Sequence, residues 1–278
     1  MIALSGSQLN SAGIVNSTIR RPLLLAHRGT SIMAPENTIP AFEFAMAHRA
    51  DVLEIDVRLS RDGKVIVTHD ETIDRTTNGN GKVRSHDLIG LKKLDAGYRF
   101  QLDGKKLWKS KGVVLLTLEE LFEAFPAAGV NIDVKDNDPA AVAAVVSVIE
   151  KLGVLERSVI ASFHDQNLEF CRTNFAGVRT SAGKSDVKRF YWRYLLRHKK
   201  NILSGSQLLQ LPPRYYFVNL SSSRFINAVH SAGGEVNYWT INEPAAMKKL
   251  LALGADGIVT DRADLAAGVL ENFKPGLQ

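Results

Sequence analysis

Short apolar runs, rich in β-branched residues, recur along most of the chain and alternate with segments of helical character. Eight such runs are residues 23–26, 52–57, 65–68, 130–134, 158–162, 178–181, 235–241 and 257–260. Runs of this length and composition are typical of strands that are buried on both faces. The alternation predicts a parallel α/β fold, and eight strands in 278 residues indicate one (β/α)8 barrel, which commonly needs about 250 residues. A ninth candidate strand, residues 216–220, leaves the strand count open.

Several segments between these runs begin with helix start signals. Thr117 and Glu120 have the spacing of a capping box. Asp138-Pro139 and Glu243-Pro244 each place a proline at the start of an apolar periodic segment. These signals predict helices between the strands, as the barrel requires.

One connection breaks the alternation of strands and helices. Only residues 58–64 join the runs 52–57 and 65–68, which is too short for a crossover helix, and Asp62-Gly63 is a turn signal. A hairpin-like join makes the barrel irregular between its second and third strands. It also predicts that His69 lies near Glu54 and Asp56.

The remaining segments define the predicted domain organisation. Residues 1–21 are predicted to be an N-terminal tail, and residues 22–278 to form a single barrel domain. Residues 71–112 are polar, glycine-rich and poor in strand signals, so we predict a small insertion after the third strand. No apolar run approaches the ~20 residues that a membrane-spanning helix needs.

Charge and cysteine content say little about partners and more about compartment. The chain has 35 basic and 29 acidic residues, a net charge of +6, which favours anionic partners without choosing between nucleic acid, lipid and a small phosphate. The single cysteine, Cys171, excludes an intrachain disulfide. We therefore predict a cytoplasmic location, with membrane association or export left open.

Two candidate strands carry carboxylates on one face. Glu54 and Asp56 alternate with apolar residues, so their side chains point the same way, and Asp133 and Lys135 repeat this pattern on a later strand. Buried carboxylates on one face repel each other unless a cation or a proton joins them, and all-oxygen ligands suit Mg²⁺ or Ca²⁺. Solvated acids on an edge strand, or an Asp–Lys pair at a strand end, would produce the same pattern without a metal.

Two histidines follow apolar runs close to these carboxylates. His27 ends the first run and precedes Arg28-Gly29, and His69 ends the third run and precedes Asp70. Strand ends of a barrel are where functional side chains gather, and two imidazoles can supply one acid and one base near neutral pH.

The order and spacing of these motifs closely resemble the glycerophosphodiester phosphodiesterase family. The resemblance runs from about residue 23 to residue 264 and is highly specific. It rests on Ala26-His27-Arg28-Gly29, Ala34-Pro35-Glu36-Asn37-Thr38, Glu54-Ile55-Asp56-Val57, Asp62-Gly63, His69-Asp70, residues 131–135, Ser162-Phe163, Trp239-Thr240-Ile241-Asn242 and residues 254–261. It implies a TIM barrel with a small insertion after the second histidine.

The resemblance also implies a role for each site residue. Glu54, Asp56 and Asp133 would hold a divalent cation, Mg²⁺ or Ca²⁺, and His27 and His69 would be the acid–base pair. Arg28 and Lys135 would bind the phosphate, and Phe163 and Trp239 would shape the glycerol pocket. The third ligand is often glutamate in the family, so Asp133, with its shorter side chain, is the main departure; Leu116 and Ala263 replace prolines at turns.

The function implied is metal-dependent hydrolysis of a glycerophosphodiester to glycerol 3-phosphate and an alcohol. Two alternatives are a lysophospholipase D that acts at a membrane surface and a catalytically silent barrel that binds phosphodiesters. Residues 184–200 interleave basic and aromatic side chains. This stretch is compatible with contact to an anionic membrane, or with a surface helix whose aromatic residues pack inward. Nothing else in the sequence indicates nucleic acid as a partner.

Overall fold

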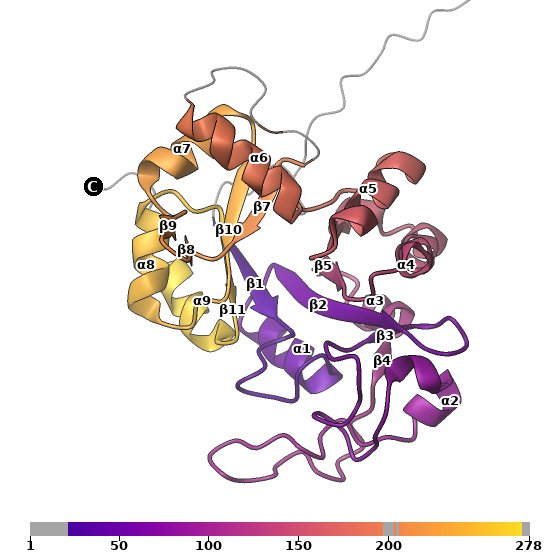
Figure 1. The fold of residues 1–278 in the computed structure, drawn as a ribbon. Coiled ribbons are helices and arrows are strands. Elements are labelled where there is room, and N and C mark those ends of the chain that lie inside the picture. The colour runs from indigo at the N-terminus through magenta and orange to yellow at the C-terminus, as the bar shows by residue number, and fades with distance from the viewer. Residues whose placement is uncertain (1–21, 197–202, 204–205, 274–278) are drawn as a thin grey trace, which may run out of the picture.

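The computed structural model describes residues 22–196, residue 203 and residues 206–273, and these form a barrel of parallel strands surrounded by helices (Figure 1). The predicted tail, residues 1–21, and the end of the basic aromatic stretch, residues 197–200, lie outside the described residues. No helix in the described part of the chain is long and apolar enough to cross a membrane.

Parallel strands close the barrel in a single circuit. β1 pairs with β2, β2 with β5 and β5 with β6, while β7 pairs with β10, β10 with β11 and β11 with β1. Single parallel bridges, Ile160 to Thr180 and Ser181 to Leu208, join β6 to β7 through a short eighth segment. These barrel strands are β1 (Leu23–His27), β2 (Val52–Leu59), β5 (Gly129–Val134), β6 (Ser158–Ala161), β7 (Leu208–Leu211), β10 (Glu235–Tyr238) and β11 (Gly257–Thr260).

The predicted (β/α)8 barrel is confirmed, but two strands were assigned wrongly. Residues 65–68 were counted as a barrel strand, whereas β3 (Val65–Val67) pairs antiparallel with the end of β2 on one side and with β4 (Leu116–Thr117) on the other, outside the barrel. The barrel strand β7 was missed because its four residues include no β-branched residue and are followed at once by Pro212-Pro213. The ninth candidate, residues 216–220, does contain a strand, β9 (Val218–Asn219). This strand is not part of the barrel, because it forms a small separate hairpin with β8 (Arg214–Tyr215).

The hairpin-like join is where the sequence predicted it. Val57 to Leu59 pair antiparallel with Val67 to Val65, and the backbone N–H of Thr68 donates to the carbonyl of Asp56 at 2.9 Å. The turn places the start of the 69–70 segment beside β2. The barrel is therefore irregular at this point for a local reason, the short connection.

Helices cover the outside of the barrel, and their start signals behave as predicted. The capping box is present, since Thr117 accepts from the Glu120 N–H and Glu120 from the Thr117 N–H. Asp138 caps the next long helix, which ends at Gly153 in a left-handed conformation with φ 65°. The covering helices are α1 (Ile39–Ala47), α3 (Leu118–Ala124), α4 (Pro139–Leu152), α5 (Asp165–Asn174), α6 (Lys184–Leu195), α7 (Ser223–Ser231), α8 (Pro244–Ala252) and α9 (Ala263–Glu271).

Alternate residues of each strand face two different environments. On β2, Leu53, Ile55 and Val57 pack in the main core between strands and helices, whereas Val52 belongs to a small cluster with residues of four other barrel strands. Glu54 and Asp56 share the face of Val52 and therefore point into the barrel.

Residues 71–112 lie to one side of the barrel, in long loops with the short elements η1 (Val83–Ser85) and α2 (Leu88–Leu91) (Figure 1). They have a small apolar cluster of their own, in which Ile73, Val83 and Leu91 pack beside Ile66 of β3. The division of the chain into a tail and one domain with an insertion stays a prediction.

Candidate active site

A cavity of about 380 Å³ opens where the barrel strands end, and every predicted site residue lines it. Carboxyl ends of parallel strands meet at one end of a barrel, so residues from distant parts of the chain converge there. The predicted site residues that line this cavity are His27, Arg28, Glu54, Asp56, His69, Asp133, Lys135, Phe163 and Trp239. The structure thus brings the predicted set together.

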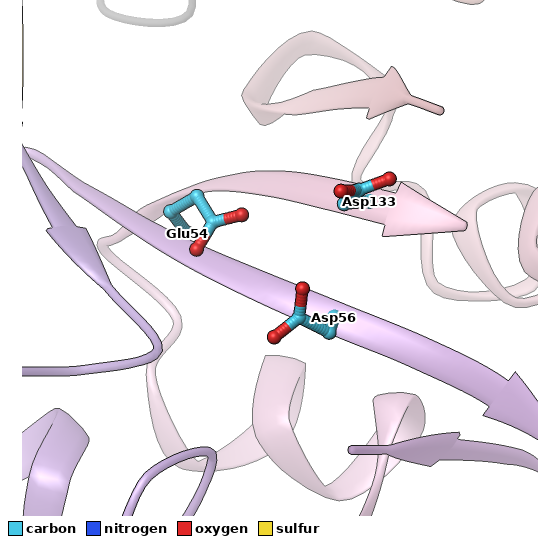
Figure 2. Close-up of side chains that lie close together, drawn as sticks. All are labelled: Glu54, Asp56 and Asp133. Carbon is cyan, nitrogen blue, oxygen red and sulfur yellow. The ribbon is translucent and has the colours of Figure 1, made fainter. Parts of the chain in front are cut away.

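Three carboxylates from two neighbouring strands line the cavity together. Glu54 and Asp56 lie on β2, and Asp133 lies on β5 directly opposite Asp56 in the strand register (Figure 2). One oxygen from each of the three lies within 4.8 Å of the others, and all three residues are at most 8% exposed. The geometry matches what a single hard cation needs from its protein ligands.

The charges around this cluster are only partly balanced. Lys135 Nζ lies 2.6 Å from Asp133 Oδ2 and 2.9 Å from Asp56 Oδ1, and Arg28 Nε lies 3.1 Å from Asp56 Oδ2. Burial alone would raise the pKa of Asp56, but the charges of Lys135 and Arg28 hold it below its ordinary value. Asp56 is therefore ionised at neutral pH.

Burial outweighs the nearby positive charges at the other two carboxylates, although Lys135 also contacts Asp133. Burial, and then the charge of Asp56, raise the pKa of Glu54 to about 7, and burial also raises the pKa of Asp133. Asp133 Oδ1 is buried and has no hydrogen-bond partner among the described residues. A buried carboxylate oxygen without a partner is costly unless a cation neutralises it. Beside two further acids, it fits the donor set of a divalent metal.

His27 lies at the end of β1, between the acidic cluster and a fourth carboxylate, that of Asp261. Its Nε2 lies 4.0 Å from Glu54 Oε2, and its Nδ1 lies 2.7 Å from Asp261 Oδ1. Asp261 accepts further hydrogen bonds from Ser31 Oγ at 2.6 Å and Asn242 Nδ2 at 2.9 Å. Burial would lower the pKa of His27, but the hydrogen bond to Asp261 and the charges of Glu54 and Asp261 raise it above its ordinary value.

His69 is held by its neighbour in the chain. Its Nδ1 lies 2.7 Å from Asp70 Oδ1, and Asp70 Oδ2 accepts from Arg75 Nε at 2.5 Å. Arg75 also donates two hydrogen bonds, at 2.7 and 2.8 Å, to Glu36. Glu36 in turn accepts from Arg28 NH1 at 3.1 Å. An ionic chain therefore joins Asp70, the carboxylate beside His69, to Arg28 at the cavity.

The cavity lining also contains aromatic and apolar residues. Phe163 and Trp239 meet edge to face with ring centroids 5.9 Å apart. Lys135 Nζ and Lys184 Nζ lie 5.4 and 5.3 Å from the centre of the Phe163 ring. Leu211, Pro212 and Tyr215 add further apolar surface to the lining. The cavity therefore offers cationic groups that suit an anion and apolar groups that suit a carbon chain.

Several residues that shape the site were not singled out from the sequence. Asp70 directly follows His69 and could have been recognised as its partner from adjacency alone. Asp261 lies 234 residues from His27, and nothing in the local sequence indicates that the two meet. Glu36 and Asp261 lie in motifs that carry the family resemblance but had no assigned role, and Arg75 gave no signal, because ion pairing leaves no periodicity in a sequence.

The chain matches known proteins over nearly its whole length. The model of the glycerophosphoryl diester phosphodiesterase family matches residues 27–265. A glycerophosphodiester phosphodiesterase from Caldanaerobacter subterraneus is 33% identical over 253 residues, which are 87% of this chain and 94% of the relative. A more distant relative, a lysophospholipase D from Mus musculus, is 24% identical and aligns with 86% of this chain and 78% of its own length.

A solved structure is similar in both fold and sequence. It is an Oleispira antarctica phosphodiesterase in complex with the product sn-glycerol-3-phosphate. The two superpose with a TM-score of 0.73 and 25% sequence identity, over 91% of this chain and 98% of the other.

Proposed function

This chain belongs to the glycerophosphoryl diester phosphodiesterase family and is a glycerophosphodiester phosphodiesterase, and we propose that it hydrolyses its substrate to glycerol 3-phosphate and an alcohol with a divalent cation as cofactor. The observation that supports this proposal most strongly is the meeting, in one cavity, of three buried carboxylates and two histidines that each have a carboxylate behind them. A small-molecule phosphodiester with a glycerol arm is the proposed substrate.

In the proposed site, Glu54, Asp56 and Asp133 hold the cation, which would neutralise negative charge on the phosphoryl oxygens and polarise the phosphorus centre. Mg²⁺ and Ca²⁺ both accept a ligand set made only of oxygens. Arg28 and Lys135 contact carboxylates of this set and line the cavity, which supports a role for them in binding a non-bridging phosphate oxygen.

The two histidines supply the proton transfers in this proposal. One accepts a proton from the attacking hydroxyl as its oxygen bonds to phosphorus, and the other donates a proton to the alcohol oxygen as the phosphorus–oxygen bond breaks. Asp261 and Asp70 accept from Nδ1 of His27 and His69 and so favour the tautomer that leaves Nε2 free for these transfers. Phe163 and Trp239 would pack against the carbon chain of the glycerol arm.

The experiment that tests this proposal is removal and return of the metal. The purified protein is treated with a chelator and assayed for glycerol 3-phosphate release from glycerophosphocholine, and Mg²⁺ or Ca²⁺ is then added back. Chelation should abolish turnover and one of the two ions should restore it. Asp133→Asn should respond weakly to added ion, whereas Glu169→Gln, a change at an exposed position on α5, should behave as wild type.

Two outcomes would contradict the proposal. Unchanged turnover after chelation would overturn the metal dependence. No hydrolysis of any glycerophosphodiester with either ion would favour the alternative of a silent barrel that binds phosphodiesters without cleaving them.

A second candidate function is lysophospholipase D activity on lipids that keep an acyl chain. The apolar lining formed by Leu211, Pro212 and Tyr215 favours it, as does the relative from Mus musculus that is named for this activity. Faster turnover of lysophosphatidylcholine than of glycerophosphocholine would support this function, and the reverse order would support the first.

We also keep three sequence predictions as part of the proposal. Residues 22–278 would act as one catalytic domain that includes the insertion at about 71–112. The protein would work in the cytoplasm, with any membrane contact made through residues 184–200. On α6, however, Phe190, Tyr191 and Tyr194 pack around Phe225 of α7, which favours the surface-helix interpretation for these three aromatic residues.

A further inference from the structure

The β8–β9 hairpin exposes three consecutive aromatic side chains. Arg214 pairs with Asn219 and Tyr215 with Val218, so Tyr216 and Phe217 form a two-residue turn. Tyr215, Tyr216 and Phe217 are 61%, 82% and 100% exposed, and the last two are the most exposed large apolar residues in the described part of the chain. Phe217 therefore buries none of its side chain in the protein itself, and Tyr216 buries little.

Turn formation does not explain these residues. A two-residue hairpin turn with a positive φ at its first central residue alone favours glycine there, and Tyr216 has a φ of 50°. A bulky side chain is strained in this conformation. Small polar residues would suit both the conformation of the turn and its exposure to solvent. The fold itself therefore does not account for the aromatic pair.

The hairpin begins at the mouth of the candidate active site. Tyr215 lines the cavity together with Pro212 and Leu211, and its ring meets that of Tyr216 edge to face at 4.9 Å. The apolar lining of the cavity therefore continues along Tyr215 to the exposed turn. An occupant of the turn would sit next to the entrance used by the substrate.

The charges beside this entrance are basic. Lys184 lines the cavity and is exposed, and Lys188 on α6 and Arg214 on the hairpin are exposed as well. The acid of α6, Asp186, is turned inward, where it lies 2.9 Å from Arg172. Exposed aromatic residues with lysine and arginine beside them are the combination that binds the headgroup region of an anionic bilayer.

We propose that the Tyr216-Phe217 turn inserts into the interface of a bilayer containing anionic lipid and presents the cavity to phosphodiesters at that surface. This inference rests on the proposed function for its substrate but not for the binding itself. A second copy of the chain is a poorer occupant, because a stable interface uses about 20–30 residues on each side and the hairpin offers only residues 214–219.

The test uses a variant that should keep the hairpin. Tyr216→Gly with Phe217→Asn replaces the aromatic pair by glycine where the φ is positive and by a small polar residue beside it, so the variant should fold at least as well as wild type. Ile89→Asn is the matched control, because Ile89 is a large apolar residue, 71% exposed, on the distant helix α2 (Figure 1). Each full-length protein is sedimented with vesicles of phosphatidylcholine mixed with phosphatidylglycerol, and with vesicles of phosphatidylcholine alone.

Wild type and Ile89→Asn should bind the mixed vesicles, and the hairpin variant should bind about tenfold more weakly. Turnover of soluble glycerophosphocholine should be equal in all three proteins, because residues 216 and 217 do not line the cavity. Equal vesicle binding by the hairpin variant would overturn the inference. So would a hairpin-dependent dimer, seen by light scattering, in a protein that binds no vesicles. Binding is measured without turnover, so a failure of the proposed function would leave its result intact.

Discussion

The two histidines of the candidate site have the same local geometry but are held in place by different parts of the molecule. In both, Nδ1 lies 2.7 Å from a carboxylate oxygen. The partner of His27 is Asp261, which follows β11, the strand hydrogen-bonded to β1, and its side chain is only 13% exposed. The partner of His69 is the next residue, Asp70, which is 28% exposed and is tied to the surface side chain of Arg75.

This difference shows two ways of orienting an imidazole. The pair of His27 and Asp261, the His27 corner, is part of the barrel framework, because pairing of β1 with β11 sets the distance between these two residues. The pair of His69 and Asp70, the His69 corner, is set by chain adjacency and by an ionic chain through Arg75, which is 49% exposed. Ion pairs at a surface are weak and are screened by salt, so the second corner should be easier to disturb than the first.

The largest effects should come from removing either imidazole, and they test whether the two corners contribute equally. His27→Ala and His69→Ala should each lower kcat by about 10²–10⁴-fold, the usual contribution of a general acid or base. Steady-state turnover of glycerophosphocholine measures this, and circular dichroism checks that each variant is folded. Near-full activity in either variant would show that its histidine is not part of the acid–base pair.

Removing the supporting carboxylates should separate the corners. Asp261→Asn should lower kcat by about 10–100-fold, because the buried partner that fixes the His27 tautomer is lost where water cannot replace it. Asp70→Asn should have a smaller effect, since solvent reaches the exposed His69 corner. Kinetics of both variants at several salt concentrations measure the difference. Equal losses would contradict the distinction between a framework corner and a surface corner.

Acid stability should show the same asymmetry. Burial opposes the ionisation of Asp261, but hydrogen bonds from His27, Ser31 and Asn242 bring its pKa down to about 2 from an ordinary 3.8. A carboxyl whose pKa is lower in the folded state stabilises the fold above its unfolded pKa and loses this contribution as pH falls toward its folded pKa. The contribution is about 2 kcal/mol at neutral pH and disappears between about pH 4 and pH 2.

Urea unfolding of wild type and Asp261→Asn across this pH range measures the effect. The difference in free energy of unfolding between the two proteins should shrink as pH falls. Asp70 also has a pKa lowered to about 2, against burial, by Arg75 and His69, but salt should reduce its contribution because the group is more exposed. A difference for Asp261→Asn that does not change with pH would show that Asp261 is not held as an anion in the folded protein.

The contrast between the corners also explains what could be predicted from the sequence. Strand periodicity and the short 58–64 connection predicted the faces of Glu54 and Asp56 and brought His69 beside them, because both depend on residues close in the chain. The partnership of His27 with Asp261 depends on barrel closure over 234 residues, so no local pattern contains it.

The two strand errors have different causes. β3 has the composition of a barrel strand, but the tight turn at Asp62-Gly63 forces it antiparallel to β2 and out of the barrel. β7 is a run of only four residues without a β-branched residue, and Pro212-Pro213 follow it at once, so its local signal for a strand is weak. The connection decided the position of β3, whereas barrel closure decided that of β7.

The smallest effect should come from the ionic chain behind His69. Arg75 is 49% exposed and links Asp70 to Glu36, which also accepts from Arg28. Arg75→Ala should break the link between Asp70 and Glu36 and lower kcat/KM only a few-fold, in line with the weak energies of exposed ion pairs. Arg75→Lys should recover part of the loss, because a lysine keeps the charge but cannot donate the paired hydrogen bonds to Glu36 and reach Asp70 at once. High salt should reduce the activity of wild type toward that of Arg75→Ala and leave the variant almost unchanged, whereas a parallel salt response in both proteins would show that the chain does not position His69.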